Sequence, residues 1–143
     1  LNGVIFSIEP DSGQTKMYHT PEMKSTRGIS VDPSDNVWFA DYYGHKLGML
    51  DPRTGKVTFY QPPNKYASPY GLSLDAKRGY LWYGDTMANN ATRFDLKTKK
   101  FVEYPLPTSK AFIRFMGLDE RGRAWYGGFG NSKLGVVDPG DAD

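Results

Sequence analysis

The chain has 143 residues, which is enough for one domain with its own hydrophobic core. Its 18 basic and 16 acidic residues nearly balance and form no long basic run, which argues against nucleic acid as a partner. Cysteine is absent, so disulfides, thiolate metal sites and a cysteine nucleophile are excluded, and no apolar run is long enough for a membrane span. Aromatic residues (15%), 16 glycines and 10 prolines indicate an all-β fold of short strands and turns.

Short strand-like segments recur in the same order along the chain. The first two are Val4–Ile8 and Thr15–Tyr18. A full set of four follows at Gly28–Asp32, Val37–Asp41, Leu47–Pro52 and Val57–Tyr60. A second full set lies at Gly71–Asp75, Leu81–Asp85, Thr92–Leu96 and Phe101–Pro105. The last set reaches its third member, with segments at Gly117–Asp119, Ala124–Gly128 and Leu134–Pro139.

The repeat has a period of about 43 residues, marked by Trp38, Trp82 and Trp125. Four short strands per repeat of this length predict the blades of a β-propeller, here a partial one of about three and a third four-stranded antiparallel blades. We expect the end of a blade in residues 1–22, blades in 23–64 and 65–108, and an incomplete blade in 109–143. A ring of four blades needs roughly 170 residues at this period, so we expect a longer chain or a second copy to supply the remaining blades.

The four strands of a blade are named A to D from the channel outward. In strand B, Trp38 and Phe39 point to opposite faces of the sheet, which predicts that such doublets form the core between blades. In the C–D turn of the same blade, Gly55 takes the left-handed position. Lys99 replaces this glycine in the next blade, so we predict either a positive φ at Lys99 or a different turn.

Three longer motifs carry a resemblance to a known family: Asn36–Asp41 (NVWFAD), Lys46–Lys56 (KLGMLDPRTGK) and Phe101–Thr108 (FVEYPLPT). They resemble the blade motifs of the streptogramin lyase (virginiamycin B lyase-like) β-propeller family and, more distantly, those of NHL-repeat and SMP-30/gluconolactonase propellers. The resemblance spans nearly the whole chain and implies a bacterial protein that is secreted or periplasmic. Because these motifs build the scaffold of the blades, they do not assign an activity.

The lyases of this family are metal-dependent, and the resemblance implies a Glu-x-His pair just before strand A of a late blade. The matching positions in this chain are Ser25 and Arg27, Ser68 and Tyr70, and Arg114 and Met116. None of them is Glu or His, which argues against an intact lyase site within these residues. A further glutamate of the family closes a strand B, and it is matched only by Asp41 and Asp85.

Any ligand is expected at the end of the ring that carries the D–A and B–C loops, because the D–A loops are the longest and pocket residues concentrate on such loops. The candidate ligand-binding residues at this end are Arg27, Tyr42, Tyr43, His45, Tyr70, Asn89, Asn90 and Arg114. Two questions stay open among the charged candidates. Arg27 and Arg114 either clamp an anion or pair with Asp41 and Asp85. The two aspartates either hold Ca²⁺ or Mg²⁺ or cap the B–C loops.

Three functions are compatible with the sequence. The first, which we favour, is a non-catalytic binding or interaction propeller. The second is a divalent-metal-dependent lyase or lactonase-type hydrolase whose site includes Asp41 and Asp85 and is completed by other blades. The third is a structural subunit that completes its ring with another chain. The sequence identifies no substrate.

Overall fold

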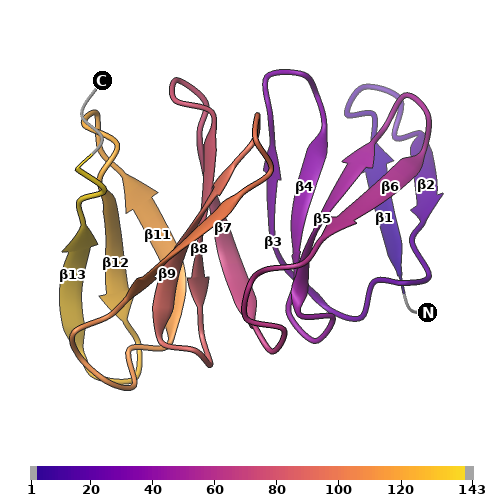
Figure 1. Cartoon of the computed structure of the whole chain (residues 1–143). Coiled ribbons are helices and arrows are strands. Elements are labelled where there is room, and N and C mark those ends of the chain that lie inside the picture. Colours follow the sequence, from indigo (N-terminus) through magenta and orange to yellow (C-terminus); the bar gives the residue numbers. More distant parts are fainter. Residues whose placement is uncertain (1–2, 141–143) are drawn as a thin grey trace.

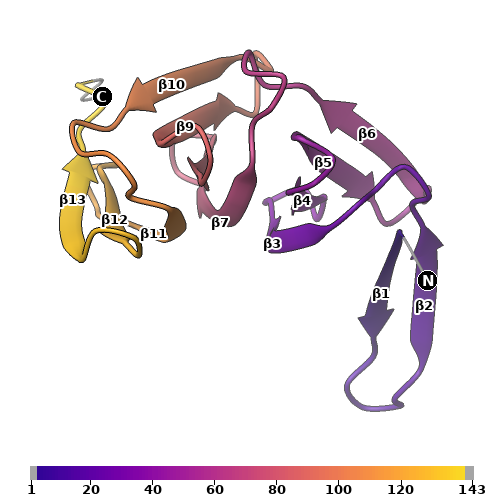
Figure 2. The same ribbon diagram turned by 90° about the horizontal axis from the view of Figure 1, so that it is seen from below.

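A computed structural model describes residues 3–140, which form β-strands joined by turns and loops (Figure 1). No helix in this part of the chain is long and apolar enough to cross a membrane. The strands make four antiparallel sheets that follow one another in chain order. Figure 2 shows the sheets arranged along an arc, with β3, β7 and β11 on its inner side and β6 and β10 on its outer side.

The bounds of the strands follow the predicted repeat closely. The first sheet is a hairpin of β1 (Val4–Ile8) and β2 (Thr15–His19). The second contains β3 (Thr26–Val31), β4 (Val37–Asp41), β5 (Lys46–Asp51) and β6 (Lys56–Tyr60). The third contains β7 (Pro69–Asp75), β8 (Tyr80–Asp85), β9 (Asn90–Asp95) and β10 (Phe101–Pro105). The fourth contains β11 (Ile113–Leu118), β12 (Ala124–Gly128) and β13 (Lys133–Val137). The predicted all-β partial propeller with four-stranded antiparallel blades is confirmed.

The hydrophobic core lies between neighbouring sheets, and the strand-B doublets build it. Trp38 packs in one cluster with Tyr83 and Phe94 of the next blade, whereas Phe39 belongs to a second cluster on the other face of its sheet. The last strand of a blade adds an aromatic ring to this core. Tyr60 stacks on Trp38 with the ring centroids 5.5 Å apart, and the second and third sheets therefore bury a continuous layer of rings.

The C–D turns confirm the prediction for Lys99. Gly55 has a φ of 75° and Lys99 a φ of 61°, so both occupy the left-handed region. The lysine turn therefore keeps the geometry of the glycine turn, at the cost of an unfavourable backbone conformation.

Strand A of each blade contains a β-bulge, and its position shows which residues of the three inner strands are structurally equivalent. The first residue of the strand pairs with the last residue of strand B, and one extra residue follows before the ladder resumes; the paired residues are Thr26 and Asp41, Pro69 and Asp85, and Ile113 and Gly128. Arg27, Tyr70 and Arg114 are therefore structurally equivalent. The sequence alignment placed Met116 at this position, and this was wrong.

The misalignment has a physical cause in the packing of the inner strands. Gly28 and Gly71 lie so close to the next blade that a Cβ would come within 2.6 Å of Tyr70 O and 2.3 Å of Arg114 O, respectively. Phe115 takes this place in the fourth sheet, where its side chain is 73% exposed. Gly117, two residues further on, therefore resembles Gly28 and Gly71 in sequence but does not share their place in the sheet.

Candidate functional site

The D–A and B–C loops lie together at one end of the sheets, the lower end in Figure 1. Asp41 ties these loops to each other in the first complete blade. Its Oδ1 accepts backbone hydrogen bonds from Lys24 (3.0 Å), Ser25 (2.8 Å) and Gly44 (3.2 Å). Asp41 is fully buried, and its position favours capping of the loops over contact with a ligand.

Asp85 has the same role in the next blade. Its Oδ1 accepts backbone hydrogen bonds from Ser68 (2.9 Å) and Ala88 (3.1 Å). Burial raises the pKa of this carboxyl more strongly than its backbone hydrogen bonds lower it. Its Oδ2, like that of Asp41, is buried without a hydrogen-bond partner.

His45 and Asn89 hold neighbouring blades together. Both residues have a positive φ, of 60° and 58°, and both reach the D–A loop that leads into the next blade. Nδ1 of His45 donates a hydrogen bond of 2.7 Å to the carbonyl oxygen of Ala67, so this nitrogen carries a proton. Asn89 accepts a hydrogen bond from the Ala111 amide and donates one to the Thr108 carbonyl, each 2.9 Å long.

Arg27 lies over three tyrosine rings at the inner edge of this end. Its Cζ is 5.5 Å from the ring centroid of Tyr42, 5.8 Å from that of Tyr43 and 5.9 Å from that of Tyr70. These distances are in the range of cation–π contacts. The rings also contact one another edge to face, with centroids 4.9 Å apart for Tyr42 and Tyr43 and 5.7 Å apart for Tyr42 and Tyr70.

Arg114 extends the same group of side chains into the fourth sheet. Its Cζ is 6.0 Å from the Tyr70 centroid and 3.7 Å from that of Phe129, and Phe115 meets Tyr70 edge to face at 6.3 Å. The result is one continuous set of ring and guanidinium contacts across three blades. We call it the mouth cluster, and it consists of Arg27, Tyr42, Tyr43, Tyr70, Arg114, Phe115 and Phe129.

The structure thus brings five of the predicted ligand-binding residues together and leaves three elsewhere. Arg27, Tyr42, Tyr43, Tyr70 and Arg114 all belong to the mouth cluster. His45 and Asn89 form hydrogen bonds to the D–A loops. Asn90 is the first residue of β9 and pairs with Asp85.

Two members of the mouth cluster, Phe115 and Phe129, were missed by the sequence analysis. Phe129 directly follows strand B, as Tyr42 does, and this shared position was a usable signal. Phe115 carried no comparable signal, because the equivalent positions of the two preceding blades hold Gly28 and Gly71.

The charges around the mouth cluster are mostly positive. Arg27 and Arg114 are exposed, and the nearby D–A loops add the exposed Lys24, Lys65 and Lys110 against one exposed carboxylate, Glu22. Within residues 3–140, no carboxylate lies within ion-pair distance of either arginine. Pairing of Arg27 and Arg114 with Asp41 or Asp85, one of the two alternatives from the sequence, does not occur.

The metal assignment of Asp41 and Asp85 stays a prediction. Ca²⁺ and Mg²⁺ need several oxygen ligands, and in the described part of the chain no three His, Asp or Glu side chains come together as such a group. The two carboxylates by themselves therefore do not fit a divalent-metal site. Such a site would need ligands from beyond residues 3–140.

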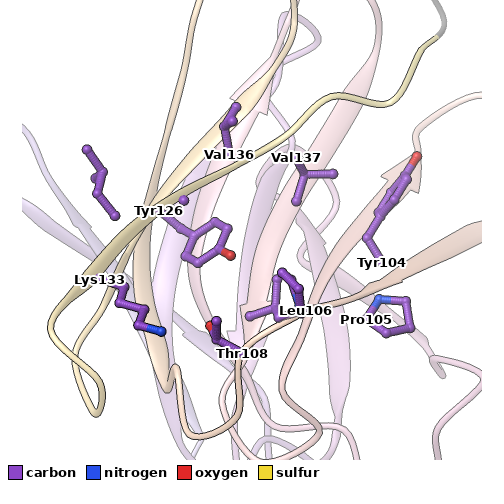
Figure 3. A pocket seen from close by; sticks show the side chains of 11 residues that line it. Tyr104, Pro105, Leu106, Thr108, Tyr126, Lys133, Val136 and Val137 are labelled. Carbon is purple, nitrogen blue, oxygen red and sulfur yellow. The ribbon is translucent and has the colours of Figure 1, made fainter.

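A separate groove of about 360 Å³ runs along the outer side of β13, between this strand and the segment after β10 (Figure 3). Tyr104, Leu106, Tyr126 and Val137 are among its lining residues. In the complete blades, strand D occupies the matching place beside strand C, and there β10 approaches the preceding D–A segment. The groove therefore has the position of a fourth strand, and we do not place the ligand in it.

Comparison with known proteins identifies the family. A model of the virginiamycin B lyase family matches residues 2–141. The chain belongs to this family. No curated protein matches it.

Solved structures of lyases share the fold of this chain. Virginiamycin B lyase from Staphylococcus aureus is 23% identical, with a TM-score of 0.85, and the match covers 96% of this chain and 46% of the lyase. A streptogramin B lyase structure is 25% identical, with a TM-score of 0.80, and the match covers 96% of this chain and 48% of that one. The chain thus spans less than half the length of these two relatives.

A third solved structure is an extracellular domain assigned to a one-component system of B. thetaiotaomicron. It is 13% identical, with a TM-score of 0.72, and the match covers 95% of this chain and 18% of that chain. The named sources of these relatives are bacteria, in keeping with the bacterial origin that the motifs implied. A secreted or periplasmic location stays a prediction.

Proposed function

We propose that this part of the propeller is a binding module and that its ligand, a small molecule, lies on the mouth cluster. The observation that supports this most is the unbroken series of contacts from Tyr43 through Tyr42 and Tyr70 to Phe115. Tyr43 is 63% exposed, although an aromatic ring contributes most to stability when it is buried. Exposed apolar rings gathered at one place on a rigid scaffold are typical of a binding site.

The loops beneath the cluster give it a fixed shape. Asp41, Asp85, His45 and Asn89 use their side chains to hold the D–A and B–C loops through hydrogen bonds of 2.7–3.2 Å. A site that is held before the ligand arrives binds with a smaller loss of conformational entropy. These four residues therefore support binding from below and are not expected to touch the ligand.

The catalytic alternative has less support. The resemblance places Glu-x-His before strand A, and the three structurally equivalent second positions hold Arg27, Tyr70 and Arg114. A metal-dependent lyase or lactonase-type hydrolase would therefore need its catalytic residues in other blades. Binding of Ca²⁺ or Mg²⁺ that raises the melting temperature, and loss of that shift in Asp85→Asn, would favour this alternative.

The whole protein's activity and partners are proposals as well, because the chain spans less than half of the two lyases. We expect the remaining blades to come from a longer chain, with completion by a second copy as the alternative. The more distant likeness to NHL-repeat and SMP-30 propellers adds no further assignment.

The binding site can be located with small aromatic probes. We would titrate indole, 2-naphthamide and 2-naphthoate into the ¹⁵N-labelled protein and follow the backbone amide signals by NMR. The proposal predicts that at least one probe shifts the signals of residues 24–28, 42–45, 66–71 and 110–115 together. Shifts confined to the A–B and C–D turns, or no shift with any probe, would overturn it.

A matched pair of variants separates the cluster from the rest of the surface. Tyr70→Ala removes the ring that both arginines contact. Tyr66→Ala removes a ring from the same D–A loop that is 66% exposed and contacts His45 instead. Binding of the probes should be lost in Tyr70→Ala and retained in Tyr66→Ala.

A further inference from the structure

We infer that the ligand of the mouth cluster is an aromatic oxyanion, that is, a carboxylate or phosphate attached to a planar ring, with its negative charge bound by Arg27 and Arg114. This inference rests on the proposed function, because it names the ligand class of that site. The ring of the ligand would lie on the exposed aromatic side chains of the cluster.

Both guanidinium groups lie beside the ring of Tyr70. The Cζ atoms of Arg27 and Arg114 are 5.9 Å and 6.0 Å from the centroid of Tyr70. Each arginine comes from the bulge of its own strand A, so the positions of both are set by the packing of β3, β7 and β11.

Nothing in the described part of the chain neutralises these charges. No carboxylate forms an ion pair with either arginine within residues 3–140, and the nearest loops contribute more lysines than acids. Asp41 and Asp85, the acids that close neighbouring strands B within residues 3–140, are buried and accept backbone hydrogen bonds. An incoming anion would therefore meet a positive field and two free planar donors suited to oxyanions.

The aromatic part of the ligand follows from the rings around the arginines. Tyr43 is 63% exposed beside Arg27, and Arg114 lies over the ring of Phe129, with its Cζ 3.7 Å from the centroid. A simple inorganic anion would leave these rings in water, whereas a planar ring on the anion would cover them.

The test compares ligands that differ only in charge. 2-Naphthoate and 2-naphthamide have the same ring and nearly the same size, and 2-naphthyl phosphate and inorganic phosphate complete the set. In the NMR titration, 2-naphthoate or 2-naphthyl phosphate should bind at least about tenfold more tightly than 2-naphthamide, which corresponds to about 1.4 kcal/mol. The tighter of the two anions identifies the oxyanion, and inorganic phosphate alone should bind weakly.

Variants of the arginines assign the effect to the cluster. In Arg27→Gln/Arg114→Gln the preference for the anionic probes should disappear, while 2-naphthamide binds as before. Arg121→Gln, an exposed arginine on an A–B turn at the other end, is the matched control and should change nothing. Because the exchanged side chains are exposed, the variants should keep the wild-type melting temperature, which verifies their folding.

The outcomes separate this inference from the proposed function. Equal affinity of 2-naphthamide and the anionic probes at the mouth cluster would overturn the oxyanion and leave the binding site in place. Tight binding of inorganic phosphate without any gain from the ring would overturn the aromatic part. Absence of any shift at the cluster would overturn both proposals.

Discussion

Nε1 of Trp38 donates a hydrogen bond of 2.8 Å to Oδ2 of Asp32, which begins the A–B turn of the same blade. Trp125 and Asp119 repeat this contact at 3.0 Å in the fourth sheet. The middle blade breaks the pattern, because Asp75 Oδ2 accepts a hydrogen bond from Arg78 instead. The strand-B tryptophan is therefore tied to the turn in two blades out of three.

Asp32→Ala should lower the free energy of unfolding by about 2 kcal/mol, because it leaves the buried Trp38 indole without its acceptor and removes the bonds that close the turn. Asp75→Ala is the matched control. It leaves no indole newly unpaired, since Nε1 of Trp82 is already buried without a partner, and it should cost less. Urea unfolding followed by tryptophan fluorescence measures both, and equal losses would contradict the role of the indole hydrogen bond.

Tyr83→Phe should leave the protein as stable as the wild type or raise the free energy of unfolding by about 1 kcal/mol. The buried hydroxyl of Tyr83 interacts with the buried hydroxyl of Thr92, but neither oxygen has a hydrogen bond of normal geometry, and such a group costs free energy that its removal recovers. The equivalent position in the preceding blade is Phe39, and Phe39→Tyr should be destabilising for the same reason. A clear loss of stability in Tyr83→Phe would show that the hydroxyl has a partner, such as an ordered water.

The contribution of Asp85 to the free energy of unfolding should decrease as the pH rises. Its pKa in the folded protein is raised, chiefly by burial, so between the ordinary pKa of aspartate and this raised value the folded state binds more protons than the unfolded state. Protonation of Asp85 therefore stabilises the folded state in acid, and this contribution is lost as the pH rises through the raised pKa.

The carboxyls of Asp51 and Asp119 have the opposite effect. The hydrogen bond from Arg53 to Asp51 and that from Trp125 to Asp119 are the main causes that lower each pKa to about 2. The difference in unfolding free energy between the wild type and Asp85→Asn cancels these common contributions. We expect Asp85→Asn to become more stable relative to the wild type as the pH increases from acid to neutral. A difference in unfolding free energy that does not depend on pH would contradict the raised pKa.

Lys99→Gly should be more stable than Lys99→Ala by about 1 kcal/mol. Glycine adopts the φ of 61° at this position without steric cost, whereas alanine does not. The comparison with alanine is needed because the Lys99 ammonium lies 5.3 Å from the Trp38 ring centroid, and both variants lose this contact. Chemical denaturation of the pair measures the difference, and a more stable alanine variant would show that the turn rearranges.

The sequence by itself determined the repeat and therefore the blades. Strand order, the Trp38–Phe39 doublet and the left-handed position of Lys99 all follow from short-range patterns, because alternation on a strand and the conformational demands of a turn involve only neighbouring residues. Arg27, Tyr70 and Arg114 could be chosen as candidates for the same reason, since they border strand A. The end of the ring at which they lie followed from the order of the strands.

Only the tertiary structure decided which of these residues meet. The pairing of β11 with β12, which has the same bulge as β3 and β7, makes Arg114 the equivalent of Arg27 and Tyr70 and places Phe115 beside Tyr70. Whether the arginines had acidic partners also depended on the folded backbone, because the amides of Lys24, Ser25 and Ser68 take up the oxygens of Asp41 and Asp85. These hydrogen bonds join different strands and loops. Whether a carboxylate binds backbone amides or an arginine therefore depends on how the strands pack, and a local sequence pattern does not predict this.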